Sequence, residues 1–94
     1  MHPIIITKRA RADLDRLHAF IAKKSPRSAG RAVQRIIEGI DLLALFPRSG
    51  VAVRGDIRSL FIRFGRSTYV VRYKIEVELV IITRIWHGRE KRPR

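Results

Sequence analysis

The sequence predicts a single α+β domain spanning residues 1–94, in which a helical hairpin packs on a mostly antiparallel, four-stranded sheet in the order βααβββ. Two observations predict this fold. Apolar residues recur at helical spacing between residues 10 and 44, with one break at residues 24–26. From Ile57 onward, apolar residues instead alternate with polar ones or run in short β-branched segments, as they do in strands. A chain of 94 residues has the length of one ordinary domain.

The first strand is predicted at residues 4–7, a short β-branched run. Thr7 can cap the helix that follows, because its hydroxyl can accept a hydrogen bond from a backbone N–H without a partner in the first turn. The apolar stripe of this helix consists of Ala10, Leu14, Leu17 and Ile21. The polar residues expected to lie off the stripe are Arg9, Asp13, Arg16 and Lys23.

A second helix is predicted to begin at Ser25 and Pro26. Ser25 is a favoured N-cap, and the missing N–H of Pro26 costs nothing at the first helical position. Pro47 ends the helix, because the residue before a proline is pushed out of the α-helical region. Few residues join the two helices, so they should form an antiparallel hairpin with facing apolar stripes.

The rest of the chain is predicted to form three strands. Residues 47–56 are turn-like and contain one short apolar run at residues 51–53. Strands follow from Ile57 to Phe64 and over residues 69–75 and 79–86, joined by turns at residues 65–67 and 76–78. The basic tail at residues 88–94 is polar and is expected to fray.

Composition limits the classes of partner and chemistry. Lys and Arg number 21 against 8 acidic residues, a net charge of +13. Such an excess favours an anionic partner over a basic face that is merely solvated. By charge alone the candidates are nucleic acid, an acidic protein segment or a membrane surface. The absence of Cys excludes disulfides, thiolate nucleophiles and Cys-based zinc sites and fits a cytosolic protein. The three His show no metal-ligand spacing, and we expect neither metal nor cofactor.

The sequence is not expected to engage a membrane. The apolar run at residues 4–6 lacks the small-residue cleavage site of a signal peptide. Every apolar stretch is much shorter than the roughly 20 residues of a membrane span.

Cationic residues gather in three places. The first group, at the start of the first helix, is Lys8, Arg9 and Arg11. The second, on the predicted sheet, is Arg58, Arg63, Arg66, Arg72 and Lys74. Guanidinium groups on a rigid sheet suit phosphate or carboxylate recognition, and a solvated face is the alternative interpretation. The third is the run 84–92, in which Trp86 can stack a base or fill the core, and His87 can exchange protons or serve structure.

Three segments resemble the RelE/ParE superfamily of bacterial type II toxins, which includes plasmid-stabilisation toxins. Residues 46–50 (FPRSG) resemble the family's turn after the second helix. Residues 56–60 followed by 69–75 resemble its central hairpin, and residues 83–89 resemble its last strand with the closing R-x-x-H-G-R signature. The resemblance covers nearly the whole chain and implies a cytoplasmic bacterial toxin neutralised by a small acidic antitoxin of the ParD, RelB or Phd type.

The resemblance leaves two targets open. RelE-like members cut mRNA on the ribosome without metal, whereas ParE-like members inhibit DNA gyrase. In RelE-like sequences a tyrosine of the central strand is followed by a catalytic arginine, but Tyr69 is followed by Val70. Those sequences also tend to carry a tyrosine after the final basic stretch, which this chain lacks. His87 matches a histidine found in both branches and does not distinguish them. The two departures from the RelE-like pattern therefore favour the ParE-like function. A plain nucleic-acid-binding module is a third possibility.

The resemblance and the charge pattern together give candidate site residues. The candidates for binding the target are Arg58, Arg63, Arg84, Trp86, His87 and Arg89. The candidates for binding the antitoxin are Leu14, Leu17, Arg58, Arg72 and Lys74. If the protein is a nuclease, the catalytic candidates are Arg58, Arg84 and His87.

Overall fold

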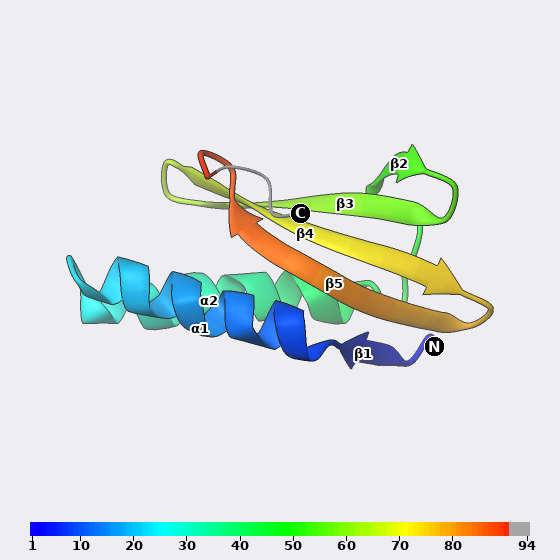
Figure 1. The fold of residues 1–94 in the computed structure, drawn as a ribbon, viewed down its shortest axis with the longest axis horizontal. Helices are drawn as coiled ribbons and strands as arrows, with labels where there is room; N and C mark the ends of the chain where they lie inside the picture. The colour runs from blue at the N-terminus through cyan, green and yellow to red at the C-terminus, as the bar shows by residue number, and fades with distance from the viewer. Residues whose placement is uncertain (91–94) are drawn as a thin grey trace.

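The computed structural model describes residues 1–90, and these form two helices and five strands. In chain order the elements are β1 (Ile4–Ile6), α1 (Lys8–Ala22), α2 (Pro26–Leu42), β2 (Val51–Arg54), β3 (Ile57–Phe64), β4 (Ser67–Glu76) and β5 (Leu79–His87). The helices lie together on one face of a single sheet (Figure 1), so the predicted α+β arrangement is confirmed. Within residues 1–90, no helix is long and apolar enough to cross a membrane.

The sheet has the strand order β1-β5-β4-β3-β2. β1 pairs in parallel with β5, and the other neighbouring strands are antiparallel. The fifth strand, β2, corrects the four-stranded prediction. Its residue Val51 pairs with Ser59 and Ala52 pairs with Arg58 at the free edge of β3. Glycines flank this run, and that pattern is typical of a turn, whereas the strand is formed by pairing with β3.

The helix starts were predicted correctly because their signals are local. The hydroxyl of Thr7 accepts a hydrogen bond from the N–H of Ala10 at 3.2 Å, and that of Ser25 accepts one from Ser28 at the same distance. Each bond satisfies one N–H of a first helical turn. α2 ends at Leu42, earlier than Pro47 required, and a turn follows at residues 43–45.

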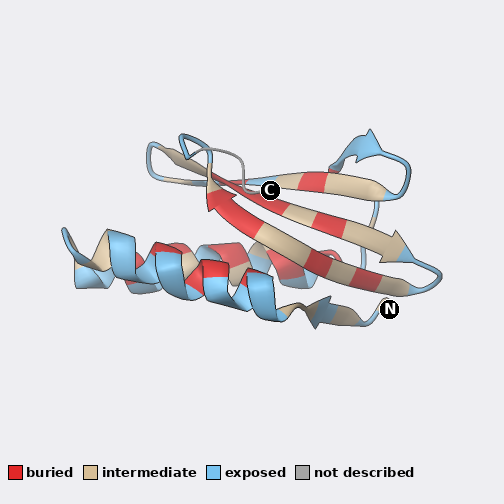
Figure 2. Cartoon of the chain, in the orientation of Figure 1, coloured by how far each residue is buried: buried red, intermediate tan, exposed pale blue. Residues whose placement is uncertain are grey.

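The core fills the space between the helices and the sheet. Figure 2 shows the buried residues on the surfaces of α1, α2 and the sheet that face each other. Leu17, Ile36 and Ile40 from the helices meet Val71 and Tyr73 from the sheet in one cluster. This packing makes the sheet a rigid platform for the side chains on its other face and at its ends.

Gly30 in α2 is not required by the packing. A Cβ built on it would meet no atom within 4 Å, and no positive φ is recorded there. Glycine inside a helix is less stable than alanine by roughly 0.5–1 kcal/mol. We therefore expect Gly30→Ala to raise the free energy of urea unfolding by about that amount. An unchanged or lower value would mean that this turn of α2 departs from an ordinary helix.

Candidate functional site

The free edge of β5 is covered by side chains of α1. β1 pairs only with Val80–Ile82, so the strand edge at Ile85 has no strand neighbour on that side. Asp13 accepts a hydrogen bond from the N–H of Ile85 at 2.8 Å, and Arg16 donates to the carbonyl of Ile85 at 3.3 Å. The helix thus satisfies both backbone groups that another strand would have paired.

Asp13 is the buried anion of this end of the fold, with only 4% of its surface exposed. Besides Ile85, it accepts hydrogen bonds from Arg84 Nε at 2.9 Å and Nη2 at 3.1 Å. Burial raises the pKa of Asp13, but the hydrogen bonds from Arg84 and Ile85 and the nearby guanidinium charge together outweigh it, so the pKa lies below its ordinary value. The expectation that Asp13 lies off the core-facing stripe was wrong.

The turn after β5 is anchored by Glu90. Its carboxylate accepts a hydrogen bond from the N–H of His87 at 2.7 Å and forms an ion pair with Arg16. The N–H of Gly88 donates to the carbonyl of Thr68 at 2.7 Å. Residues 88–90, expected to fray with the rest of 88–94, are therefore tied to β4 and α1, and residues 91–94 lie outside the described part of the chain.

The ring of His87 is held at the end of β5. It contacts Tyr69 edge to face, with ring centroids 5.3 Å apart, and its Nδ1 accepts the N–H of Arg89 at 3.0 Å. Since Nδ1 is an acceptor, the neutral ring carries its proton on Nε2. Burial raises the pKa of Tyr69, so its hydroxyl keeps its proton at neutral pH and cannot act as a base.

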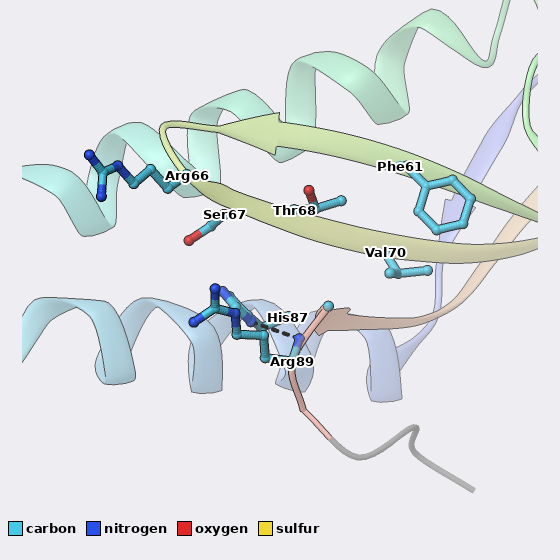
Figure 3. Close-up of a pocket in the computed structure, with 8 residues that line it drawn as sticks. Phe61, Arg66, Ser67, Thr68, Val70, His87 and Arg89 are labelled. Atoms are coloured by element: carbon cyan, nitrogen blue, oxygen red, sulfur yellow. Dashed lines mark hydrogen bonds between the residues drawn. The ribbon is translucent and has the colours of Figure 1, made fainter.

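Two hollows meet at His87 and Arg89. The larger, of about 570 Å³, runs along the outer side of the β3–β4 hairpin, and Figure 3 shows His87 and Arg89 at one part of it and Phe61 and Val70 at another. The second hollow, of about 490 Å³, lies between this turn and α1. We define the His87 surface as five side chains around the two hollows: the half-buried His87 and the exposed Phe20, Phe61, Arg66 and Arg89.

The outer face of the sheet, opposite the helices, carries further cations. The guanidinium of Arg72 lies 5.1 Å from the ring centroid of Trp86 and donates to the hydroxyl of Ser59 at 3.0 Å. Trp86 is only 6% exposed, which leaves little of the ring available to stack on a base. Lys74 pairs with Glu76 at 2.6 Å, and this partner raises the pKa of the lysine. Arg63 is exposed on the same face.

Arg58 lies apart from these residues. Its cross-strand partner on β4 is Tyr73, whose side chain faces the helices, whereas Arg72 pairs with Arg84 on the other face. Arg58 donates to the carbonyls of Gly50 at 2.8 Å and Arg48 at 3.2 Å, so its guanidinium holds the turn before β2. The register therefore places Arg58 on the opposite face from Arg72 and Lys74, two other cations of the predicted sheet group.

Leu14 and Leu17 are in the core, with 9% and 1% of their surfaces exposed. Both pack between α1 and the sheet, and their contact with an antitoxin stays a prediction. Sequence reasoning assigned no functional or anchoring role to Phe20, Arg16 or Glu90. The spacing of Asp13 from Ala10 and Leu17 was a usable signal for its burial, since those positions share one helical face.

No cluster of possible metal ligands exists within residues 1–90.

Comparisons with known proteins agree on one group. Residues 4–92 match the family described as the ParE toxin of the type II toxin–antitoxin system parDE. Toxin RelE1 of Caulobacter vibrioides is 36% identical over 89 residues, covering 95% of this chain and 96% of the relative. Toxin RelE3 of the same bacterium is 32% identical over 92 residues, covering 98% and 100%. A solved chain of the chromosomal ParDE system from P. aeruginosa has the same fold, with a TM-score of 0.75 at 24% identity, covering 93% and 96%.

Proposed function

This chain belongs to the ParE toxin family of type II toxin–antitoxin systems, and from that premise we propose that it arrests bacterial growth by binding DNA gyrase. It is the toxin of such a pair and has an antitoxin as its partner. The His87 surface is the part that contacts gyrase. The proposed site of action is the bacterial cytoplasm, where gyrase and its DNA are found.

The observation that carries the proposal is that the three nuclease candidates do not converge. Arg58 is hydrogen bonded to backbone carbonyls, and Arg84 is paired with Asp13. On β4, the partners of Arg58 and His87 are residues 73 and 69, separated by about 13 Å at roughly 3.3 Å per residue. Acid–base groups must lie within hydrogen-bonding reach of one reacting centre. This separation favours binding over cleavage.

The His87 surface has the composition of a protein-binding site. Phe20 and Phe61 are 63% and 55% exposed, and the arginines Arg66 and Arg89 lie beside them. Aromatic and arginine side chains contribute most of the affinity at many protein interfaces, particularly where they surround a pocket. Because Glu90 fixes the turn that carries His87 and Arg89, these two residues are already positioned before the target binds, which lowers the entropic cost of binding.

The proposal extends to the antitoxin, which we expect to be acidic and ParD-like. Its arm would cross the outer face of the sheet, where Arg63, Arg72 and Lys74 complement negative charge. A hollow of about 380 Å³ on that face shares Phe61 and Val70 with the larger hollow beside His87. An arm bound there would cover part of the His87 surface, which accounts for neutralisation.

Replacing Arg89 by alanine tests the target surface. We expect the concentration of toxin that half-inhibits gyrase supercoiling to rise roughly 10- to 30-fold, because truncating a central arginine typically costs about 1.4–2 kcal/mol of binding. In bacteria, the same substitution should relieve growth arrest and the DNA-damage response. Antitoxin binding, measured by calorimetry, should change much less.

Arg54→Ala is the matched control, because Arg54 is exposed on β2 at the far edge of the sheet. It should inhibit gyrase as the parent protein does. Transcript integrity is followed in the same cultures. Rapid mRNA cleavage on induction, lost with His87→Ala, would replace the gyrase proposal with ribosome-dependent cleavage.

A further inference from the structure

The solvent side of α2 carries a row of three arginines. Arg27, Arg31 and Arg35 follow one another every fourth residue, about 6 Å apart along the helix axis at roughly 1.5 Å per residue. All three are exposed, and none forms an ion pair with another residue in the range 1–90. We call them the α2 arginine row. They share no residue with the His87 surface.

The row is unfavourable for the helix that carries it. Like charges four residues apart repel each other, and Arg27 lies in the first turn, where a positive charge opposes the helix dipole. That turn contains no acidic residue to compensate. The buried face of α2 consists of Ala29, Ala32, Ile36 and Ile40, so the packing does not require the arginines. A bound anionic ligand would offset this cost, because it would neutralise the repulsion between the arginines.

Gly30 gives a second, independent indication. It lies within the row, is exposed, and would meet nothing if it carried a Cβ. Its cost in a helix interior therefore has no explanation in the packing of the fold. Glycine is used where the protein backbone must approach a ligand closely. A hollow of about 340 Å³ lies at this place, lined by Gly30, Arg31, Gln34, Arg35, Glu38 and Phe64.

We propose that α2 binds the phosphodiester backbone of a nucleic acid. The planar guanidinium groups match phosphate oxygens, and Gly30 admits the sugar–phosphate chain close to the helix. Between Arg27 and Glu38, every exposed residue is polar or glycine. Protein interfaces have an apolar core depleted of charge, whereas nucleic-acid interfaces are polar and strongly positive. Glu38 lies at the far end of the row and would repel phosphate, so the contacts lie on its N-terminal side.

The test is fluorescence anisotropy of the full chain with a labelled DNA duplex and a single-stranded RNA of the same length, across a range of salt concentrations. The triple variant R27Q/R31Q/R35Q should lower the slope of log K against log salt by about 0.9 per lost phosphate contact on duplex DNA, or about 0.7 on a single strand. At 0.1 M salt its Kd should rise on the order of a hundredfold. Gly30→Ala should weaken binding without changing charge, although it stabilises the helix.

The control is K8Q/R11Q/R54Q, which removes the same charge from exposed positions outside α2. It should retain the salt slope of the parent protein. If both triple variants lost the same affinity for nucleic acid, the effect would come from overall charge and the proposal would be overturned. Full affinity in R27Q/R31Q/R35Q would overturn it as well. Polyglutamate that binds as tightly as either nucleic acid would assign the row to an acidic protein instead. Whichever of the DNA duplex and the single-stranded RNA binds more tightly is the kind of nucleic acid that the row recognises.

Discussion

Replacing Asp13 by alanine is expected to lower the free energy of unfolding by about 3 kcal/mol, the low end of the range for breaking a buried ion pair. The carboxylate is the acceptor for the N–H of Ile85 and for two nitrogens of Arg84. Without it, the strand edge loses its hydrogen-bond acceptor and Arg84, which is 22% exposed, loses its counterion. Thermal unfolding should occur on the order of 15 °C lower.

Asp15→Ala is the matched control, because Asp15 lies on the same helix and is exposed. It should unfold within about 0.5 kcal/mol of the parent protein. A loss of similar size in both variants would trace the effect to the net charge of α1 rather than to the buried contacts of Asp13.

The carboxylate of Asp13 also makes the stability of the protein depend on pH. Because the pKa of Asp13 is lower in the folded protein than in the unfolded chain, the unfolded chain binds the proton first as the pH falls. The contribution of the Asp13 carboxylate to the free energy of unfolding is complete above the ordinary aspartate pKa. It is lost as the pH drops through the pKa that Asp13 has in the folded protein. Urea unfolding at a series of pH values should therefore show an acid-dependent loss of stability that is reduced in Asp13→Ala.

Gly50→Ala is expected to destabilise the protein by about 3 kcal/mol, through overpacking and a disturbed buried hydrogen bond. A Cβ at this position would lie 2.5 Å from the Tyr73 hydroxyl and 2.9 Å from the Ser59 carbonyl. The N–H of Gly50 donates to that hydroxyl at 2.9 Å, and the hydroxyl donates to the carbonyl of Pro47 at 2.7 Å. The added methyl group must therefore displace the contacts that hold the turn to the sheet.

The free energies of urea unfolding of Gly50→Ala and Gly30→Ala should be compared directly. Both replace glycine by alanine, yet the first should destabilise and the second should stabilise, because only Gly50 is crowded. Equal effects in the two variants would contradict the close packing of Tyr73 against the turn. Loss of this turn should also release Arg58, whose guanidinium is bonded to the Gly50 carbonyl.

Features fixed by local chemistry could be predicted from the sequence, and features fixed by pairing could not. The caps at Thr7 and Ser25 depend on neighbouring residues, so both were predicted correctly. β2 depends on the free edge of β3, which is not visible in its own four residues. Strand order likewise follows from long-range pairing, including the parallel contact of β1 with β5.

The faces of the site residues depend on one irregularity in register. Between β4 and β5 the pairing shifts after Arg72, so that Arg72 pairs with Arg84 but Tyr73 pairs with Ile82. The extra residue on β5, Thr83, inverts the alternation, and Ile82 and Ile85 both face the core. A continuous apolar run cannot reveal such a bulge. The sequence therefore identified His87 and Arg89 as candidates but not the separation of Arg58 from Arg84.

Supercoiling by purified gyrase tests most directly whether this toxin acts by holding gyrase through the His87 surface. Relaxed plasmid, ATP and gyrase are incubated with increasing toxin, alone and after mixing with the antitoxin. If it does, supercoiling should be lost in a dose-dependent way, antitoxin should reverse the loss, and Arg89→Ala should weaken the inhibition roughly tenfold or more. Full supercoiling at a toxin concentration that arrests growth, or equal inhibition by Arg89→Ala, would contradict it.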